Sequence, residues 1–256
     1  MAVTSAPSQL EEGIYYPDSD GLPLAESDWQ RKVLTYAVEA LDLYFRDQPQ
    51  IYVSGNLFVY YQKGNPKAVV APDVFVVFGV PKGARRYYML WREGKGPDVV
   101  LEITSESTRR EDQQSKRALY AALGVAEYLL VDPTGDYLAP RLQGYRLVEQ
   151  GYVPLRTDTA PDGSLSLHSP RLGLDLQLRG DEFRFFDPRS RRRLPSLAEA
   201  QAQAEQAQVQ AEQEARRAAR PRRGPSRKAA ARRAAEAELE RLRAELARLR
   251  GEASDD

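Results

Sequence analysis

The sequence predicts a mixed α/β domain followed by a helical tail. Before about residue 195, short apolar runs of strand length alternate with two segments of helical hydrophobic spacing. All aromatic residues and 15 of the 17 prolines also lie in that part of the chain. After it, Ala, Glu, Gln, Arg and Leu dominate, which is the composition of long helices and coiled coils. We therefore predict a domain over 1–195 and a tail over 196–256.

Composition excludes several classes of site. The 256 residues include no cysteine and one histidine, His168, so disulfides, thiolate zinc sites, cysteine nucleophiles and multi-histidine metal sites are impossible. Lys plus Arg and Asp plus Glu both number 37, so global charge gives no argument for nucleic-acid binding. No apolar run is long enough to span a membrane, and the N-terminus lacks the features of a signal peptide. We expect a cytoplasmic protein without a membrane partner.

The domain begins with a helix and a group of strands. Apolar residues at helical spacing predict the helix over 27–45. Strand-like runs then follow, bounded by turn residues. They cover 51–53, 56–62, 69–78 and 98–104.

A second helix is predicted over 109–123, ending at Gly124, and it leads to a buried strand over 127–131 that stops before Pro133. Shorter strands are expected at 145–147, 152–156 and 172–178. The order helix, three or four strands, helix, strand indicates a mixed sheet crossed by a helix.

The tail contains a leucine repeat. Proline and glycine within 220–226 should separate two helices. In the second helix Leu239, Leu242, Leu246 and Leu249 are spaced 3, 4 and 3, which is an a/d seam of two heptads. Because two heptads are marginal alone, the seam needs a partner, and we expect a coiled coil.

A basic block precedes the leucines. From Arg216 to Arg233 the chain has nine basic residues and no acidic one. Its candidate nucleic-acid contacts are Arg216, Arg217, Arg220, Arg222, Arg223, Arg227 and Lys228. The block could follow a DNA backbone, or it could be a charged hinge between helices.

Two carboxylates lie inside apolar runs. Asp73 interrupts the run 69–77 and Glu102 the run 99–103. Carboxylates are rarely buried unless they are paired or bind a metal ion, and two on adjacent strands could share one hard divalent cation. The alternative for Asp73 is an ordinary strand-start residue after Pro72.

The second helix could complete this site. Asp112, Lys116 and Tyr120 are spaced by four residues and share one helix face. If that face lies against the sheet, the Lys116 ammonium could reach the carboxylates; otherwise Lys116 is a solvated lysine. Arg109 and Arg110, at the helix start, could bind phosphate or face water.

The motifs together resemble a known family. They are Pro72-Asp73, Glu102-Ile103-Thr104, the helix with Arg109, Asp112, Lys116 and Tyr120, and the segment from Gly124 to Pro133. This pattern, over roughly 15–190, resembles the Uma-two type restriction endonucleases of the PD-(D/E)XK nuclease superfamily. The resemblance implies a restriction-endonuclease-like mixed β-sheet core flanked by helices.

The resemblance also assigns roles. Asp73, Glu102 and the backbone carbonyl of Ile103 would bind Mg²⁺ or Mn²⁺. The superfamily lysine belongs two residues after the acid, where this chain has Thr104, so Lys116 would replace it. Possible accessory residues are Glu39, Asp112 and Arg109. Family members often have a histidine near the start of the first helix; this chain has Ser27-Asp28-Trp29-Gln30, and Asp28 is the polar substitute.

Three other polar residues are interpreted as structural. Asp98 follows a second proline but lies on the same strand as Glu102, about 13 Å away at roughly 3.3 Å per residue, which is too far to share one ion. Asp132 is interpreted as a turn residue, and His168 as a surface or loop residue.

The leading hypothesis is an Mg²⁺-dependent DNA endonuclease that hydrolyses phosphodiester bonds. The alternative is a non-catalytic nucleic-acid-binding or assembly protein that uses the same fold and its coiled-coil tail. A homo-oligomer, most simply a dimer through domain and tail, is expected because paired sites cut both strands.

Overall fold

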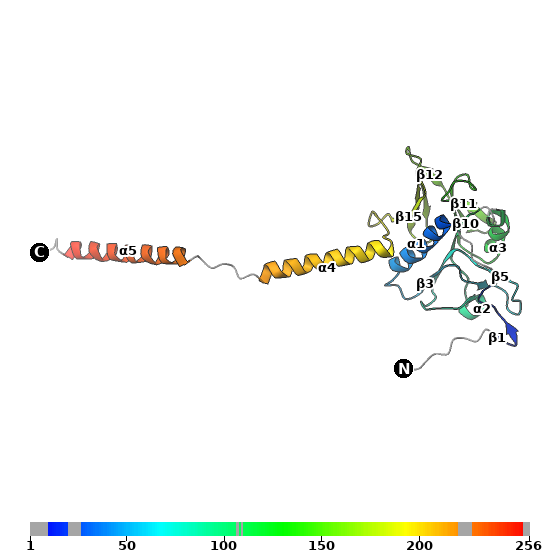
Figure 1. Cartoon of the computed structure of the whole chain (residues 1–256), viewed down its shortest axis with the longest axis horizontal. Helices are drawn as coiled ribbons and strands as arrows, with labels where there is room; N and C mark the ends of the chain where they lie inside the picture. Colours follow the sequence, from blue (N-terminus) through cyan, green and yellow to red (C-terminus); the bar gives the residue numbers. More distant parts are fainter. Residues whose placement is uncertain (1–9, 20–26, 106–107, 109, 220–226, 253–256) are drawn as a thin grey trace. The chain divides into compact units, whose positions relative to one another are not determined.

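The computed structural model describes residues 10–19, 27–105, 108, 110–219 and 227–252 (Figure 1). The chain divides into two compact units, Met1–Ala200 and Gln201–Asp256. All described strands lie in the first unit.

The elements follow the predicted order with several additions. They are β1 (Leu10–Glu11), β2 (Ile14–Tyr15), α1 (Asp28–Tyr44), β3 (Ile51–Ser54), β4 (Val59–Tyr60), β5 (Val69–Val70), β6 (Val74–Phe78), β7 (Tyr88–Met89), α2 (Leu90–Glu93), β8 (Val99–Ile103), η1 (Glu111–Lys116), α3 (Arg117–Ala122), β9 (Glu127–Val131), β10 (Leu142–Val148), β11 (Gly151–Pro154), β12 (Thr157–Thr159), β13 (Leu165–Ser169), β14 (Leu174–Arg179), β15 (Glu182–Asp187), β16 (Arg192–Arg193), α4 (Leu197–Ala219) and α5 (Arg227–Glu252).

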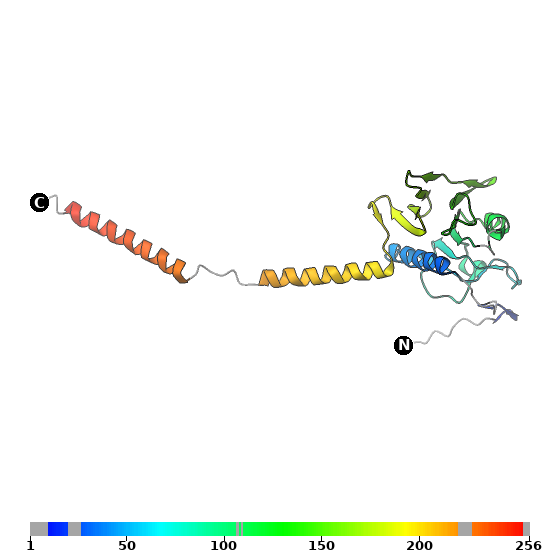
Figure 2. The same ribbon diagram turned by 45° about the horizontal axis from the view of Figure 1, so that its top comes forward.

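A six-stranded mixed sheet forms the centre of the domain. Its order is β11-β10-β9-β8-β6-β3, and β8 and β9 form its parallel pair while the other neighbours are antiparallel. The helical segments η1 and α3 connect β8 to β9 on one face, whereas α1 covers the other face (Figures 1 and 2). The mixed sheet crossed by a helix is therefore confirmed.

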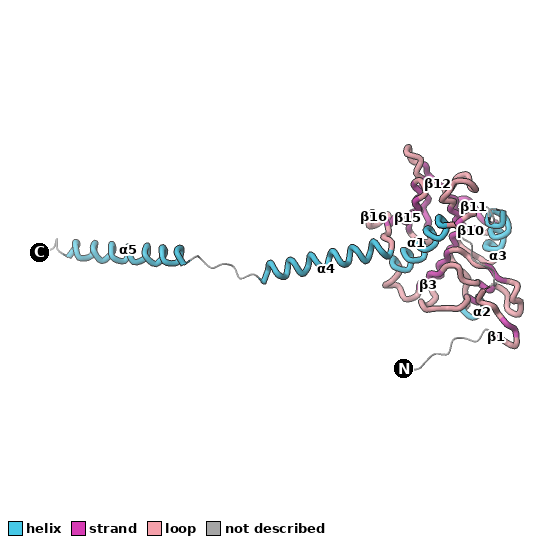
Figure 3. The backbone as a smooth tube through the Cα atoms, in the orientation of Figure 1, coloured by secondary structure: helices cyan, strands magenta, loops and turns pink. Residues whose placement is uncertain are grey.

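Smaller sheets surround this centre. Strands β12 to β16 form a five-stranded antiparallel sheet, β5-β4-β7 form a three-stranded sheet, and β1 pairs with β2 (Figure 3). The tail consists of α4 and α5, and the predicted break at 220–226 lies outside the described residues. Within the described part of the chain, no helix combines the length and the apolar character that a membrane crossing requires.

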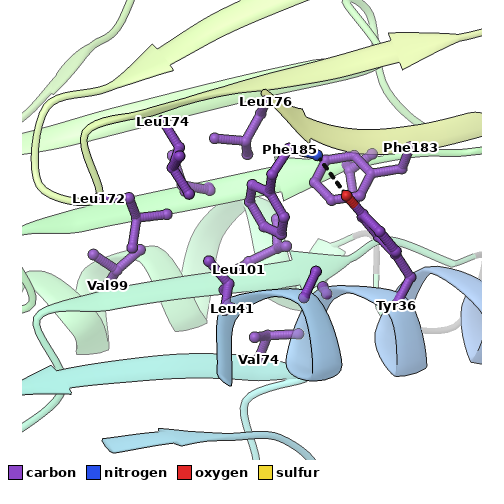
Figure 4. Close-up of a cluster of buried hydrophobic side chains, with 14 of the residues drawn as sticks. Tyr36, Leu41, Val74, Val99, Leu101, Leu172, Leu174, Leu176, Phe183 and Phe185 are labelled. Atoms are coloured by element: carbon purple, nitrogen blue, oxygen red, sulfur yellow. Dashed lines mark hydrogen bonds between the residues drawn. The ribbon is translucent and has the colours of Figure 1, made fainter. Parts of the chain in front are cut away.

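The main core lies between α1, the central sheet and β13–β15. Figure 4 shows Tyr36 and Leu41 of α1 directed toward Phe183 and Phe185, with Leu101 beside them. The Tyr36 hydroxyl accepts the N–H of Phe185 and donates to the carbonyl of Leu194, both at 3.0 Å. This buried tyrosine therefore joins α1 to the second sheet by hydrogen bonds as well as by packing.

Strand alternation decides which side chains face α3. Val74 and Leu101 belong to the core against α1, whereas Phe75 and Val100 pack with Tyr120 on the opposite face. Because successive side chains point to opposite faces, Glu102 faces α3 together with Val100.

Two of the predicted strands are corrected. The run 69–78 is two strands in different sheets, because Pro72 cannot donate a ladder hydrogen bond and the chain turns between Val70 and Val74. The run 56–62 shortens to β4, since Asn56 has a φ of 47° and its N–H donates to the Pro72 carbonyl at 3.0 Å. Strands β12, β13 and β15 are additions to the predicted set.

Candidate active site

Asp73 and Glu102 are cross-strand neighbours. The antiparallel register pairs Val74 with Leu101, so the adjoining residues Asp73 and Glu102 lie side by side. The Asp73 N–H donates to Glu102 Oε2 at 3.4 Å, and the Ile103 N–H donates to Asp73 Oδ2 at 2.7 Å. Glu102 is buried and Asp73 is partly buried. The structure thus brings together the two carboxylates that the apolar runs contain.

Lys116 reaches this pair from the helix. Its Nζ lies 3.1 Å from Glu102 Oε2 and 3.0 Å from Asp112 Oδ1. Only 11% of its side chain is exposed, so the alternative of a solvated lysine does not hold. The Tyr120 hydroxyl donates to the other oxygen of Glu102, Oε1, at 2.6 Å. The predicted helix face of Asp112, Lys116 and Tyr120 therefore packs on Glu102.

A π-helical turn carries part of this face. Glu111–Lys116 is π-helical and continues directly into α3, which ends before Gly124 at a φ of 76°. The Tyr128 hydroxyl of β9 donates to the carbonyl of Asp112 at 2.8 Å, and the rings of Tyr120 and Tyr128 lie 5.1 Å apart. The wide turn is thereby anchored to the strand beside Glu102, as π-helical turns at functional sites often are.

Burial controls the protonation of the acids. Burial raises the pKa of Glu102 and of Asp73, although the Lys116 ammonium opposes both shifts. Burial alone would lower the pKa of Lys116, but Glu102 and Asp112 raise it above its ordinary value. Burial and the Glu102 carboxylate raise the pKa of Tyr120, so this hydroxyl remains a donor. Lys116 is therefore an ammonium at neutral pH.

The cluster contains three acids and one ammonium. The acids are Asp73, Glu102 and Asp112, and burial favours the neutral forms of Glu102 and Asp73. Within the described residues, neither oxygen of buried Asp112 accepts a hydrogen bond beyond its ion pair, and Thr104 Oγ1 has no hydrogen-bond partner. Unpartnered buried polar atoms cost about 1–3 kcal/mol each, so these oxygens would gain stability from a further partner.

The donor set fits a hard divalent cation. Such ions bind one or two carboxylates together with backbone carbonyls and water. Across the described ranges, no group of three or more His, Cys, Asp or Glu side chains is arranged to hold a metal ion. The carboxylates of Asp73 and Glu102 have this chemistry, but they do not form an all-side-chain cage.

Gln30 is a polar neighbour of the site that sequence reasoning did not single out. Its Nε2 donates to the Ile103 carbonyl at 3.5 Å, and its Oε1 accepts the Ser27 N–H at 3.1 Å in a capping box. Asp28, the expected polar substitute, is exposed and pairs with Arg31 at 2.5 Å. The pattern Ser-x-x-Gln predicts the capping box, but not that Gln30 reaches β8.

Gly55 is a second residue that the sequence did not reveal. A Cβ at this position would clash with the carbonyl oxygen of Asp73 and would lie 2.8 Å from Cγ2 of Val38. The absent side chain lets the Asp73 backbone and Val38 of α1 both lie close to Gly55. A glycine beside strand-like runs is a signal for such a close approach.

Of the other candidate residues, the structure describes Glu39 and Arg110 but not Arg109. Glu39 is partly buried on α1, and among the described residues no hydrogen bond or ion pair joins it to Asp73, Glu102 or Lys116. Arg109 lies outside the described residues, while Arg110 is exposed.

The candidate nucleic-acid contacts of the tail lie on α4, on α5 or outside the described residues. Arg216 and Arg217 are exposed on α4, and Lys228 is exposed on α5. Arg227 is the first residue of α5. Arg220, Arg222 and Arg223 lie outside the described residues.

The three residues interpreted as structural behave as predicted. Asp98 precedes β8, at the opposite end from Glu102, and pairs with Arg171 at 2.5 Å and Lys95 at 2.7 Å. His168 is exposed and lies 2.7 Å from Asp175.

Asp132 organises the loop after β9. Its carboxylate accepts the backbone N–H groups of Thr134, Gly135, Tyr137 and Leu138 at 2.7–3.0 Å. It is a turn residue, as the sequence indicates.

Comparisons with known proteins place the chain in a family. A crystal structure described as "a putative nuclease belonging to DUF820", from Anabaena variabilis ATCC 29413, is 13% identical, with 69% of this chain and 74% of that chain covered and a TM-score of 0.36. No curated protein matches the chain. The sequence model of the Uma2 family, described as "Putative restriction endonuclease", matches residues 12–179. This match covers well over half of the chain and includes Asp73, Glu102 and Lys116. The protein therefore belongs to the Uma2 family.

Proposed function

We propose that the protein is a metal-dependent DNA endonuclease that hydrolyses phosphodiester bonds. Asp73, Glu102 and the carbonyl of Ile103 hold Mg²⁺ or Mn²⁺ in this proposal. The observation that carries it is the contact of Lys116 with Glu102, itself the cross-strand neighbour of Asp73, inside a buried cluster of three acids and one ammonium. Membership of the Uma2 family supports nuclease activity in general.

Lys116, Tyr120 and Asp112 have separate roles in the proposed reaction. A bound divalent ion supplies Lewis-acid polarisation of the phosphate and a more acidic water. Lys116, held as an ammonium, stabilises negative charge that develops on the phosphate in the transition state. Tyr120 donates to Glu102 and thereby favours its ionised form. Asp112 fixes the ammonium from the other side.

The proposed assembly is a homo-oligomer, most simply a dimer. Leu239 and Leu242 of the tail are half-exposed, which leaves an apolar seam for a second copy. Sedimentation at micromolar concentration should give a dimer, and a monomer would contradict this part of the proposal.

A plasmid-nicking assay tests the activity. The parent should nick plasmid DNA with Mg²⁺ or Mn²⁺ and lose this activity with EDTA. Asp73→Asn and Glu102→Gln should each reduce the rate by about a hundred-fold or more, because each removes a charged ligand. Asp98→Asn is the matched control, since Asp98 is a buried, cation-paired carboxylate at the other end of β8. Equal activity of Asp73→Asn and Asp98→Asn would reject the assigned site.

Metal binding can be measured without turnover. Mg²⁺ should raise the melting temperature of the parent and of Asp98→Asn, but not that of Asp73→Asn. Retarded DNA migration without cleavage under any metal would instead favour the non-catalytic nucleic-acid-binding or assembly protein.

A further inference from the structure

Helix α5 carries exposed leucines at the start of an apolar stripe. Leu239 is 50% exposed and Leu242 is 55% exposed, although leucines on an isolated helix gain little stability in water. Leu246 and Leu249 continue the same spacing along α5. Four leucines at a 3, 4, 3 spacing form the a and d positions of two heptads, with Leu239 and Leu246 at a and Leu242 and Leu249 at d.

The residues beside this stripe carry ordered charges. In this frame the g positions are Glu238 and Glu245, and the e positions are Arg243 and Arg250. Both flanking positions on one side are therefore acidic and both on the other side are basic. Residues at e and g determine which partner and which orientation a coiled coil accepts.

These charges distinguish the two orientations. In a parallel, in-register pair, each g residue meets the e residue five positions later on the second helix. Glu238 then meets the partner's Arg243, and Glu245 meets the partner's Arg250, so both contacts are attractive and each occurs twice. In an antiparallel pair, g meets g and e meets e, which opposes Glu to Glu and Arg to Arg.

We propose that α5 forms a parallel, in-register, two-stranded coiled coil with a second copy of this chain. A shift by one heptad would leave only half of the leucine layers matched. Toward the N-terminus the leucine seam stops at Leu239, because the a and d positions before it hold Ala235, Arg232 and Lys228. The paired region therefore starts near Ala235.

The parallel orientation has a consequence for the basic block. Both chains enter the coiled coil at the same end, so Lys228, Arg232 and Arg233 of the block, which lie on α5 itself, are next to the same residues of the second copy. They would then present one combined positive region to a polyanion such as DNA. An antiparallel pair would place the two blocks at opposite ends of the seam.

Single cysteines test the orientation in the full chain, which has none of its own. Ala235→Cys occupies a d position and should become mostly disulfide-linked under mild oxidation, because d residues of a parallel pair meet each other. Ala244→Cys is the matched control: it replaces another exposed alanine of α5, at an f position that points away from the partner. Equal cross-linking of the two variants, or none at Ala235→Cys, would overturn the proposal.

Charge reversal tests the flanking contacts. Glu238→Arg with Glu245→Arg should weaken self-association at least about ten-fold, because four attractive contacts become repulsive. Adding Arg243→Glu and Arg250→Glu should restore association, since the pairs are rebuilt with reversed sign. Sedimentation equilibrium measures both changes. A double variant that associates like the parent, or a trimeric parent, would contradict the proposed arrangement.

Discussion

Lys116 enters the candidate site from a helix, while the position two residues after Glu102 holds Thr104. Thr104 is buried on the same strand face as Glu102, and its hydroxyl has no partner among the described residues. The ammonium and the threonine thus approach the acids from two different elements. This arrangement allows the lysine to be moved experimentally from one element to the other.

The first prediction concerns that relocation. Lys116→Met should lower the cleavage rate by about a hundred-fold or more, because it removes the ammonium from the reacting phosphate. It should also destabilise the metal-free fold by about 3–5 kcal/mol, since Glu102 and Asp112 lose their buried counter-charge. Adding Thr104→Lys should restore part of the cleavage rate and part of the lost stability. Nicking rates and urea denaturation measure the two effects.

Lys82→Ala is the control for this series, because Lys82 pairs with Asp42 away from the cluster. Unchanged cleavage by Lys116→Met would remove the lysine from the mechanism and direct attention to Arg110.

The second prediction concerns Gly55. Gly55→Ala should push Asp73 away from its position, since the new Cβ would clash with the Asp73 carbonyl oxygen. We expect a loss of about 1–3 kcal/mol in stability and about a hundred-fold in cleavage rate. Gly96→Ala is the control, because its Cβ would meet its nearest atoms at an ordinary 3.6 Å. Equal activity of the two variants would show that Asp73 tolerates the displacement.

At the scale of elements, local patterns predicted most of the site. Asp112, Lys116 and Tyr120 are spaced by four residues, so spacing alone indicated a common helix face, and this helix follows the strand of Glu102 directly along the chain. Gln30 was not identifiable in this way, because it contacts a carbonyl 73 residues further along the chain. Contacts of that kind depend on how α1 docks on the sheet.

The strands were predicted less completely. The strand at 127–131 was predicted correctly. All five of its residues are buried, as in a strand that is covered on both faces of its sheet. Strand β13 alternates apolar residues with serine and histidine over only five positions, which is a weaker signal. The run 69–78 was misjudged because apolar content does not reveal where a proline transfers the chain to another sheet.

The third prediction concerns the loop after β9. Although burial raises the pKa of Asp132, its hydrogen bonds to backbone N–H groups and Thr134 lower that pKa below its ordinary value. A lowered native pKa stabilises the fold above the unfolded pKa of about 3.9, and this contribution is lost as pH falls. Asp132→Asn should therefore cost about 1–3 kcal/mol at pH 7, and the difference from the parent should shrink between about pH 5 and 2.

Chemical denaturation at several pH values measures this difference. Asp136→Asn is the control, since Asp136 is an exposed aspartate of the same loop. A difference that does not depend on pH would assign the cost to packing rather than to ionisation.

At the scale of the whole molecule, the family match and the tail occupy different parts of the sequence. The match covers 12–179 and therefore omits the basic block and the leucine seam. The proposed catalytic residues and the proposed assembly residues thus occupy separate stretches of sequence. Mutations can therefore be made in one set of residues while the other set keeps its sequence.

The fourth prediction uses this separation. Replacing the nine basic residues of 216–233 by glutamine, a good helix former, should weaken DNA binding and flatten the dependence of log K on log salt. The slope should decrease by about 0.9 for each phosphate that the protein no longer neutralises. Filter binding between about 50 and 200 mM salt measures the slope. An unchanged slope would assign the block to a hinge between α4 and α5.

The π-helical turn of η1 makes the site sensitive to the loss of a single codon. Because its hydrogen bonds span five residues rather than four, the turn holds one residue more than an α-helical turn. Deleting Gln114 or Ser115, both exposed, would let the segment close as an α-helix and shorten the spacing of Asp112 and Lys116 from i, i+4 to i, i+3, which shifts the carboxylate along and around the helix. Substitutions at the same two positions would leave that face intact. An in-frame deletion could therefore change the geometry between an acid and its lysine while every charged side chain of the site remains encoded.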